Sequence, residues 1–109
     1  MALTDMTQAL KALADPTRLR IFVTLMQGIQ CNCELSGGLD LSLSLISHHL
    51  RILRQVGLVD AVRDENDGRW IYYSINQERL DEIAGALAQL LDSRQIQPRQ
   101  PTCGPVRRP

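Results

Sequence analysis

The sequence predicts a mainly α-helical protein that contains one β-hairpin. Apolar residues recur at spacings of three and four through most of the chain, as expected of amphipathic helices. The exception is the segment 59–75, where two strand-like runs, 59–63 and 69–75, flank a turn at 64–68. A length of 109 residues suffices for one domain with a modest core.

The first two helices are separated by Asp15 and Pro16. Four apolar residues at helical spacing predict the first helix: Leu3, Met6, Leu10 and Leu13. Asp15 is a good N-cap and Pro16 a good first-turn residue for the second helix, which we expect to end at Gly28. The second helix is expected to direct four side chains inward: Leu19, Phe22, Val23 and Met26.

The segment after Leu39 first alternates apolar and polar residues, as a half-buried strand would, but the alternation fails at Ile46. From there the apolar residues follow helical intervals: Ile46, Leu50, Leu53 and Val56, with His49 on the same face. We therefore predict a helix from about Leu43 to Gln55, capped by Ser42. Its opposite face is polar and carries Ser44, Ser47, His48, Arg51 and Gln55.

A last amphipathic helix follows the hairpin, and an irregular tail follows that helix. The helix is predicted from Leu80, Ile83, Leu87, Leu90 and Leu91. Beyond Ser93, four of the five prolines cluster. We expect a folded domain over 1–93 and a flexible Pro/Arg-rich tail over 94–109 that carries Cys103.

Composition restricts the class of protein. Twelve basic and twelve acidic residues give a formal net charge of zero, which counts mildly against DNA binding. No apolar run approaches the length of a membrane span, and no secretory pattern begins the chain. We therefore expect a cytoplasmic protein with no membrane partner, in which the three cysteines are ligands, sensors or bystanders instead of disulfides.

The order helix, helix, short helix, polar-faced helix, hairpin, helix is that of a winged helix-turn-helix. Three stretches, "LKALADPTRLRI" (10–21), "LISHHLRILRQVGLV" (45–59) and "GRWIYYSI" (68–75), resemble the ArsR–SmtB family of metal-responsive repressors. The resemblance covers roughly 3–91. It implies a homodimer that binds double-stranded operator DNA, with the first and last helices at the dimer interface.

The resemblance assigns DNA contacts to the polar-faced helix and to the hairpin. Ser44, Ser47, His48 and Arg51 correspond to groove contacts, and Arg63 and Arg69 to phosphate contacts. The alternative is that these residues form only a solvated surface. Adjacent residues on a helix point about 100° apart, so His48 and His49 are not expected to share a metal ion. We expect His49 to be a hydrogen-bonded core residue.

Cys31 and Cys33 fall at the start of the short third helix, where metal-sensing relatives carry a C-x-C pair followed by an acid and a leucine, here Glu34 and Leu35. Thiolates are preferred ligands of soft ions. Residues two apart on a regular helix point nearly opposite ways, so joint binding requires a distorted first turn, which would shift the reading helix. Helix N-termini also favour thiolates. The plainer alternative is that both are small buried hydrophobes.

The resemblance also implies where a third ligand would come from. Ser36 stands where some arsenical repressors have a third cysteine, and a hydroxyl is a poor soft-metal ligand. Cys103, from the same or the partner subunit, would complete a three-sulfur site suited to trivalent arsenic; alternatively it is a bystander. Antimonite, cadmium and lead remain alternatives as inducers. A zinc site on the last helix is not expected, because 77–92 contains no histidine.

Three functional hypotheses follow. The first is a dimeric repressor that arsenite, or a similar soft ion, releases from DNA. The second keeps the fold and the DNA binding but replaces the ion with oxidation of two cysteines. The third, a thiol-dependent enzyme, lacks support, since no histidine is placed as a general base and C-x-C alone is weak. We therefore expect a protein that is not an enzyme.

Overall fold

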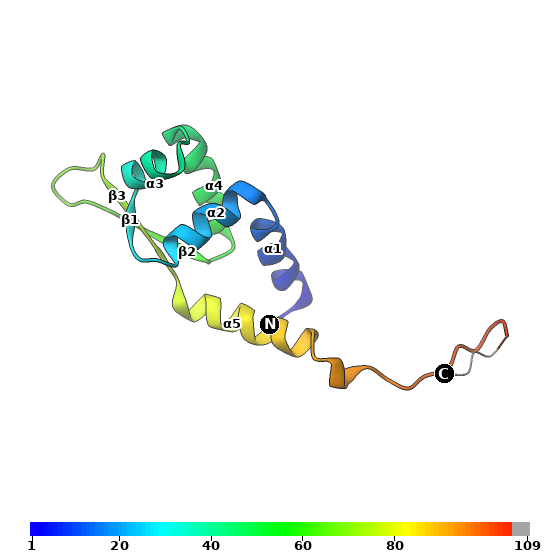
Figure 1. Ribbon diagram of the computed structural model, residues 1–109. Coiled ribbons are helices and arrows are strands. Elements are labelled where there is room, and N and C mark those ends of the chain that lie inside the picture. Colours follow the sequence, from blue (N-terminus) through cyan, green and yellow to red (C-terminus); the bar gives the residue numbers. More distant parts are fainter. Residues whose placement is uncertain (106–109) are drawn as a thin grey trace.

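The computed structural model describes residues 1–105. Within them the chain forms five α-helices, three strands and one 3₁₀ turn (Figure 1). In chain order these are α1 (Leu3–Leu13), α2 (Pro16–Leu25), β1 (Gln30–Cys31), α3 (Asn32–Leu39), α4 (Leu43–Gln55), β2 (Val59–Arg63), β3 (Ile71–Ile75), α5 (Gln77–Leu90) and η1 (Ser93–Gln95). The predicted mainly α architecture with a β-hairpin is confirmed.

Side-chain caps explain where three of the helices begin. Asp15 Oδ1 accepts from the backbone N–H groups of Thr17 and Arg18 at 2.9 and 3.0 Å, with Pro16 in the first turn of α2. The Ser42 hydroxyl accepts from the N–H of Leu45 at 3.1 Å and starts α4. Asn76 caps α5 in the same way. The predicted bounds and cap of α4 are confirmed.

The sheet is antiparallel in the order β1-β3-β2. The β2–β3 hairpin, which we call the wing (59–75), pairs Val59 with Ile75 and Arg63 with Ile71. Its second strand begins two residues later than predicted, because Trp70 closes the turn: its N–H donates to the Asp67 carbonyl, and its own carbonyl accepts from the N–H of Asp64. Strand β1 was not predicted, since two residues show no periodicity.

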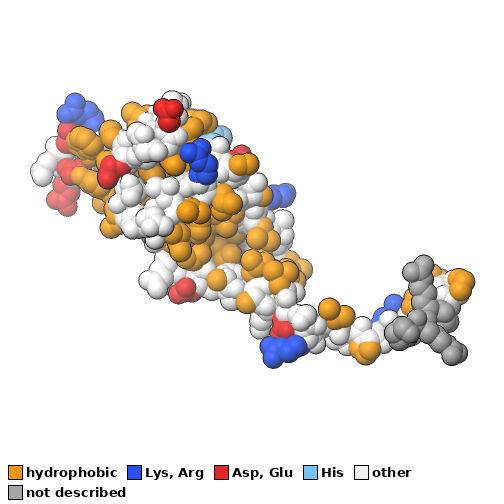
Figure 2. Space-filling view, in the orientation of Figure 1, with side chains coloured by type: hydrophobic (Ala, Val, Ile, Leu, Met, Phe, Trp, Pro, Cys, Tyr) orange, Lys and Arg blue, Asp and Glu red, His pale blue; other side chains and the backbone are white. Residues whose placement is uncertain are grey.

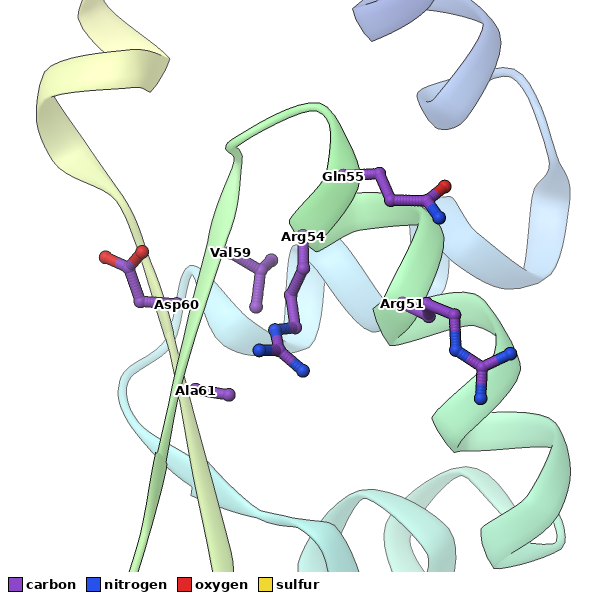
Figure 3. A pocket seen from close by; sticks show the side chains of 6 residues that line it. All are labelled: Arg51, Arg54, Gln55, Val59, Asp60 and Ala61. Atoms are coloured by element: carbon purple, nitrogen blue, oxygen red, sulfur yellow. The ribbon is translucent and has the colours of Figure 1, made fainter.

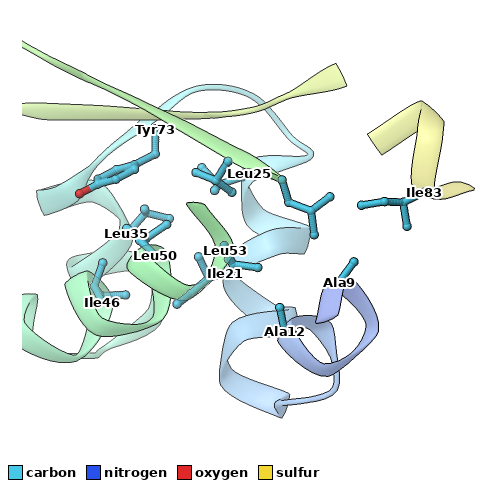
Figure 4. Close-up of a cluster of buried hydrophobic side chains, with 12 residues drawn as sticks. Ala9, Ala12, Ile21, Leu25, Leu35, Ile46, Leu50, Leu53, Tyr73 and Ile83 are labelled. Carbon is cyan, nitrogen blue, oxygen red and sulfur yellow. The ribbon is translucent and has the colours of Figure 1, made fainter. Parts of the chain in front are cut away.

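The core lies between α2, α3, α4 and the sheet (Figure 4). Six large side chains in it are fully buried: Ile21, Leu35, Ile46, Leu50, Leu53 and Leu58. Helix α1 contributes small residues, Ala9 and Ala12, to the same cluster. The small side chains let the backbone of α1 approach α2 and α4 closely.

The predicted inward face of α2 was wrong for three of its four residues. Leu19, Val23 and Met26 are 45%, 52% and 53% exposed, and α2 instead buries Ile21 and Leu25, with Phe22 partly buried. The apolar residues of α2 spread over about half of its circumference, so spacing alone could not choose which of them are buried. That choice is made by α4 and β3, against which α2 packs.

Several apolar side chains near the two ends of the domain stay outside the core. In α1, Leu3 is 69% exposed, and at the end of α5 Leu90 and Leu91 are 53% and 71% exposed. Helices α1 and α5 pack against each other, and Figure 2 shows hydrophobic side chains gathered over α2 and α5 on one face of the molecule.

Within residues 1–105, the helices are too short or too polar to cross a bilayer.

The segment after α5 makes the 3₁₀ turn η1 and then runs on without regular structure, away from the body of the domain (Figure 1). The predicted tail, 94–109, is described as far as residue 105. Its last four residues, 106–109, lie outside the described part of the chain.

Candidate nucleic-acid interface and cysteine site

Helix α4 presents a polar face to solvent and buries the opposite one. Ser44, Ser47, His48 and Arg51 are all exposed, as their predicted place on one helix face requires. The buried face carries Ile46, His49, Leu50 and Leu53. Packing of that apolar face fixes the helix in rotation, so the four polar side chains point outward together. A helix held this way has the shape and chemistry that the DNA major groove admits.

His49 is a core residue, as expected. It is 7% exposed, and Nη1 of Arg18 lies 3.2 Å from its Nδ1. A guanidinium has no acceptor, so Nδ1 must accept and the ring is neutral with its proton on Nε2. Burial lowers the pKa of His49, which favours that neutral form.

The two predicted wing arginines are held by the turn that joins β2 to β3. Nη1 of Arg63 donates to the carbonyl of Gly68. Arg69 forms an ion pair with Asp67 at 2.7 Å, and this contact lowers the pKa of the Asp67 carboxyl. Both arginines are exposed at the end of the wing. Their guanidinium groups are therefore ordered by the wing before any ligand arrives.

One candidate residue was missed from the sequence. An open pocket of about 510 Å³ lies beside α4 and β2, and Arg51, Arg54, Gln55, Val59, Asp60 and Ala61 line it. Figure 3 shows the guanidinium of Arg54 between α4 and β2, while Asp60 points to the other side of the strand. Among the described residues, neither Arg51 nor Arg54 is in an ion pair. Arg54 lies three residues after Arg51, and this helical spacing was the signal available.

The predicted position of Cys31 and Cys33 at the start of α3 is confirmed, and the structure adds a role for the first sulfur. Cys31 is the N-cap: its Sγ accepts from the N–H of Glu34 at 3.4 Å, while Glu34 Oε1 accepts from the N–H of Cys31 at 3.0 Å. That second bond lowers the pKa of the Glu34 carboxyl. The reciprocal pair holds the first turn of α3 in a regular form.

The two thiols differ in their surroundings, although they are two residues apart. Cys31 is buried, whereas Cys33 and Cys103 are exposed, and all three are free. Within residues 1–105, no group of three or more His, Cys, Asp or Glu side chains is placed to hold a metal ion. Two thiols separated by a single residue suit a soft ion chemically. Binding one ion with both requires the first turn of α3 to open, as the sequence predicts.

Ser36 has a structural role in the turn between α3 and α4. Its hydroxyl donates to the carbonyl of Leu41 and so fastens the turn between α3 and α4. Asp40 in that turn has a left-handed backbone with φ of 55°. The serine therefore stabilises the connection that sets α4 relative to α3.

Comparison with known proteins shows which family this chain resembles in sequence and structure. The model of the family described as bacterial regulatory protein, arsR family, matches residues 15–61. The arsenical resistance operon repressor of Bacillus subtilis is 39% identical over 85 residues, which cover 77% of this chain and 75% of that protein. The cadmium resistance transcriptional regulatory protein CadC homolog of Staphylococcus aureus is 31% identical over 80 residues, or 72% of this chain and 64% of that protein.

A solved structure agrees with these relatives. The homodimeric winged helix-turn-helix DNA-binding domain of a possible ArsR-family transcriptional regulator from Mycobacterium bovis has a TM-score of 0.64 and 28% identity. The match covers 87% of this chain and 84% of that one. The chain spans slightly less than two thirds of the length of several curated relatives. With an identity of 39% to a repressor that it covers by three quarters, the chain belongs to the ArsR family of bacterial regulatory proteins.

Proposed function

We propose that this chain is a dimeric transcriptional repressor that binds operator DNA and leaves it when arsenite, or a similarly soft ion, binds Cys31 and Cys33. The observation that carries the proposal is the position of the two cysteines at the start of α3, the helix directly before the exposed polar face of α4. A change in the first turn of α3 acts on the turn at Ser36 and Leu41, and through it on α4.

DNA binding is proposed for α4 and the wing. Ser44, Ser47, His48 and Arg51 read base edges in the major groove, where hydroxyl, imidazole and guanidinium groups match the donors and acceptors of the bases. Arg63 and Arg69 contact phosphates from the wing. We add Arg54, whose guanidinium lies between α4 and β2, where a backbone that passes from the groove to the wing would run.

The dimer is proposed to form through α1 and α5. Exposed leucines on these helices, Leu3, Leu90 and Leu91, leave apolar surface that a second copy would cover. Two-fold symmetry presents two α4 helices to two half-sites about one helical turn of DNA apart. The local arginines of each copy supply the attraction to phosphate that a chain of zero net charge lacks overall.

The inducer is proposed to bind by exchange of ligands at arsenic. Each cysteine thiol that replaces a hydroxyl of arsenous acid forms one As–S bond and releases one water molecule, with no change of oxidation state. Cys31 and Cys33 supply two sulfurs, and Cys103, from the same or the partner subunit, supplies the third. Antimonite, cadmium and lead take sulfur ligands as well and remain candidate inducers. Reduced thiols persist in a cytoplasm, where the protein would act.

A second candidate input is oxidation. Cys33 and Cys103 are both exposed and free. Peroxide would oxidise the two thiols to a disulfide and be reduced to two water molecules, and this bond would restrict the chain near α3 without any ion. The reductant dithiothreitol reverses a disulfide, whereas arsenite acts on reduced protein. Comparing the two treatments separates these inputs.

The test begins with an operator selected from random double-stranded DNA by the full chain. Fluorescence anisotropy then gives the dissociation constant of that DNA with and without arsenite, and a thiol reagent counts the protected cysteines. We expect arsenite to weaken DNA binding at least tenfold, with three thiols protected. Two protected thiols would exclude Cys103 from the site. Unchanged affinity on arsenite, cadmium and peroxide alike would refute the proposed regulation.

A further inference from the structure

The side chain between the two cysteines joins the cysteine site to the wing. Asn32 Oδ1 accepts from the N–H of Cys33 at 3.1 Å, and its Nδ2 donates to the carbonyl of Arg69 at 3.2 Å. Arg69 lies in the turn of the wing, 37 residues further along the chain. One amide group therefore spans the first turn of α3 and the end of the wing.

A second connection runs through the backbone. Strand β1 makes Cys31 a member of the wing's own sheet, opposite Tyr72 of β3. The hydroxyl of Tyr72 donates to Asp64 Oδ2 at 3.3 Å. Asp64 in turn accepts from the N–H groups of Asn66 and Asp67 and so orders the turn of the wing. Two adjacent residues at the cysteine site thus hold the wing.

We propose that Asn32 is a positioning residue that transmits ion binding at Cys31 and Cys33 to the wing, so that the wing and not α4 alone loses its fit to DNA. This inference rests on the proposed function, which supplies the ion and the DNA. It goes beyond that function by naming a second moving element and the side chain that couples it to the cysteines.

The coupling follows from the geometry of the first turn. Sγ of Cys31 is buried as the helix cap, and Cys33 is exposed one residue beyond Asn32. Bringing both sulfurs to one ion rotates the peptide between Asn32 and Cys33, whose N–H is the one that Asn32 Oδ1 accepts. A short side chain cannot follow that rotation and still reach the carbonyl of Arg69. The wing then loses a hydrogen bond on the side that faces α3.

The sequence provides its own probe for this movement. Trp70 is the single tryptophan of the chain, it follows Arg69 directly, and it is 40% exposed. Its emission therefore reports on the end of the wing. DNA affinity with and without arsenite gives the second readout: the ratio of the two dissociation constants is the coupling factor between inducer and DNA.

Two variants of Asn32 separate its two hydrogen bonds. Asn32→Ala removes both, while Asn32→Asp keeps the acceptor for the N–H of Cys33 and loses only the donor to Arg69. The added charge of the aspartate affects both DNA measurements alike and largely cancels in the coupling factor. Gln27→Ala, which removes an exposed amide from the loop before β1, is the matched control.

We expect arsenite to change the Trp70 emission of the wild type and of Gln27→Ala. In both Asn32 variants arsenite should still protect the thiols. Their Trp70 emission should differ from that of the wild type before arsenite is added, and arsenite should no longer change it. The coupling factor should fall by about fivefold, the size expected of one hydrogen bond. Because DNA binding, thiol protection and Trp70 emission are measured on the same folded samples, a loss of folding would show in all three.

Two results overturn the inference and leave the proposed function standing. One is a wild type that binds arsenite and leaves DNA without any change in Trp70 emission. The other is an Asn32→Asp variant with the wild-type coupling factor and Trp70 response. A wild type whose thiols arsenite does not protect would refute the proposed inducer, and with it this inference.

Discussion

Arg18 of α2 and His49 of α4 are joined by a hydrogen bond of 3.2 Å between Nη1 and Nδ1. The same guanidinium donates through Nε to the carbonyl of Ala12 in α1 at 2.7 Å. One side chain thus connects three helices, and one of them carries the candidate DNA-binding face. Arg18 is itself placed by the Asp15 cap, which accepts its backbone N–H.

The first prediction concerns pH. The pKa of His49 is lowered from 6.5, chiefly by burial. As the pH falls below 6.5, this histidine therefore binds a proton more readily in the unfolded chain than in the native state. The contribution of His49 to the free energy of unfolding should therefore be complete above about pH 6.5, and the free energy of unfolding should fall as the pH drops below that value. The carboxyl of Asp15 is still ionised in this window, since its pKa is lowered from 3.8.

Urea unfolding at several pH values between about 7.5 and 5 measures this effect. His49→Asn keeps an acceptor for Arg18 but does not titrate, so its stability should vary less over the same range. His48→Asn, which changes an exposed ring on the same helix, should keep the wild-type slope. Equal slopes for His49→Asn and the wild type would show that His49 is not the group responsible.

The second prediction separates the two roles of Cys31. Serine is a strong N-cap residue, so Cys31→Ser should keep the first turn of α3 and bind DNA as the wild type does. It should not respond to arsenite, because a hydroxyl is a poor soft ligand. Cys31→Ala should lose the cap as well, at a cost of about 1 kcal/mol in the free energy of unfolding.

DNA titrations with and without arsenite, together with urea unfolding, test both variants. Cys33→Ser serves as the companion variant, since Cys33 is exposed and is not the cap. It should lose the arsenite response without loss of stability. A full arsenite response in Cys31→Ser would remove Cys31 from the inducer site.

The third prediction concerns Arg54. If its guanidinium contacts a phosphate, Arg54→Gln should weaken binding by a similar factor on operator and on unrelated DNA, because phosphates carry no sequence information. The slope of log affinity against log salt concentration should fall in magnitude by about one. Arg94→Gln is the control, since Arg94 is paired with Asp92 beyond α5. A loss of sequence preference in Arg54→Gln would indicate a base contact instead.

The fourth prediction concerns assembly. Leu90 is 53% exposed on α5, and Leu90→Glu should place a charge in the proposed interface twice, once from each copy. Loss of two buried leucines alone weakens the dimer by about 3 kcal/mol or more, so sedimentation should show monomer at concentrations where the wild type is dimeric. Val62→Glu, at a 64% exposed site on the wing, should leave the dimer intact. A dimeric Leu90→Glu would place the interface elsewhere.

Local signals in the sequence were enough for much of the fold. The bounds of α4 follow from the Ser42 cap and a helical period that ends at Gln55, and both appear in the structure. Long-range choices were not accessible. Neither the two-residue strand β1 nor the bond from Asn32 to Arg69 has a local pattern, since each depends on a partner about 40 residues away.

The residues of the candidate site also divide into those that local sequence patterns predict and those that depend on distant parts of the chain. The polar face of α4 could be predicted, because residues opposite an apolar face of known period must be exposed. The cap formed by Cys31 could not, since cysteine is not a usual N-cap residue. Arg54 was missed because its importance comes from β2, which folds back beside α4.

The ion pair between Arg69 and Asp67 has a kinetic consequence. With the carboxylate 2.7 Å from the guanidinium, Arg69 adds no net charge to the end of the wing. Residues 63–69 hold two arginines and three acids, a net charge of −1, so the field of the DNA does not attract this end of the wing. Arg51 and Arg54 of α4, which have no ion-pair partner among residues 1–105, feel that field in full. We therefore expect α4 to contact the DNA first. The wing then closes on the DNA when a nearby phosphate replaces Asp67 as the partner of Arg69.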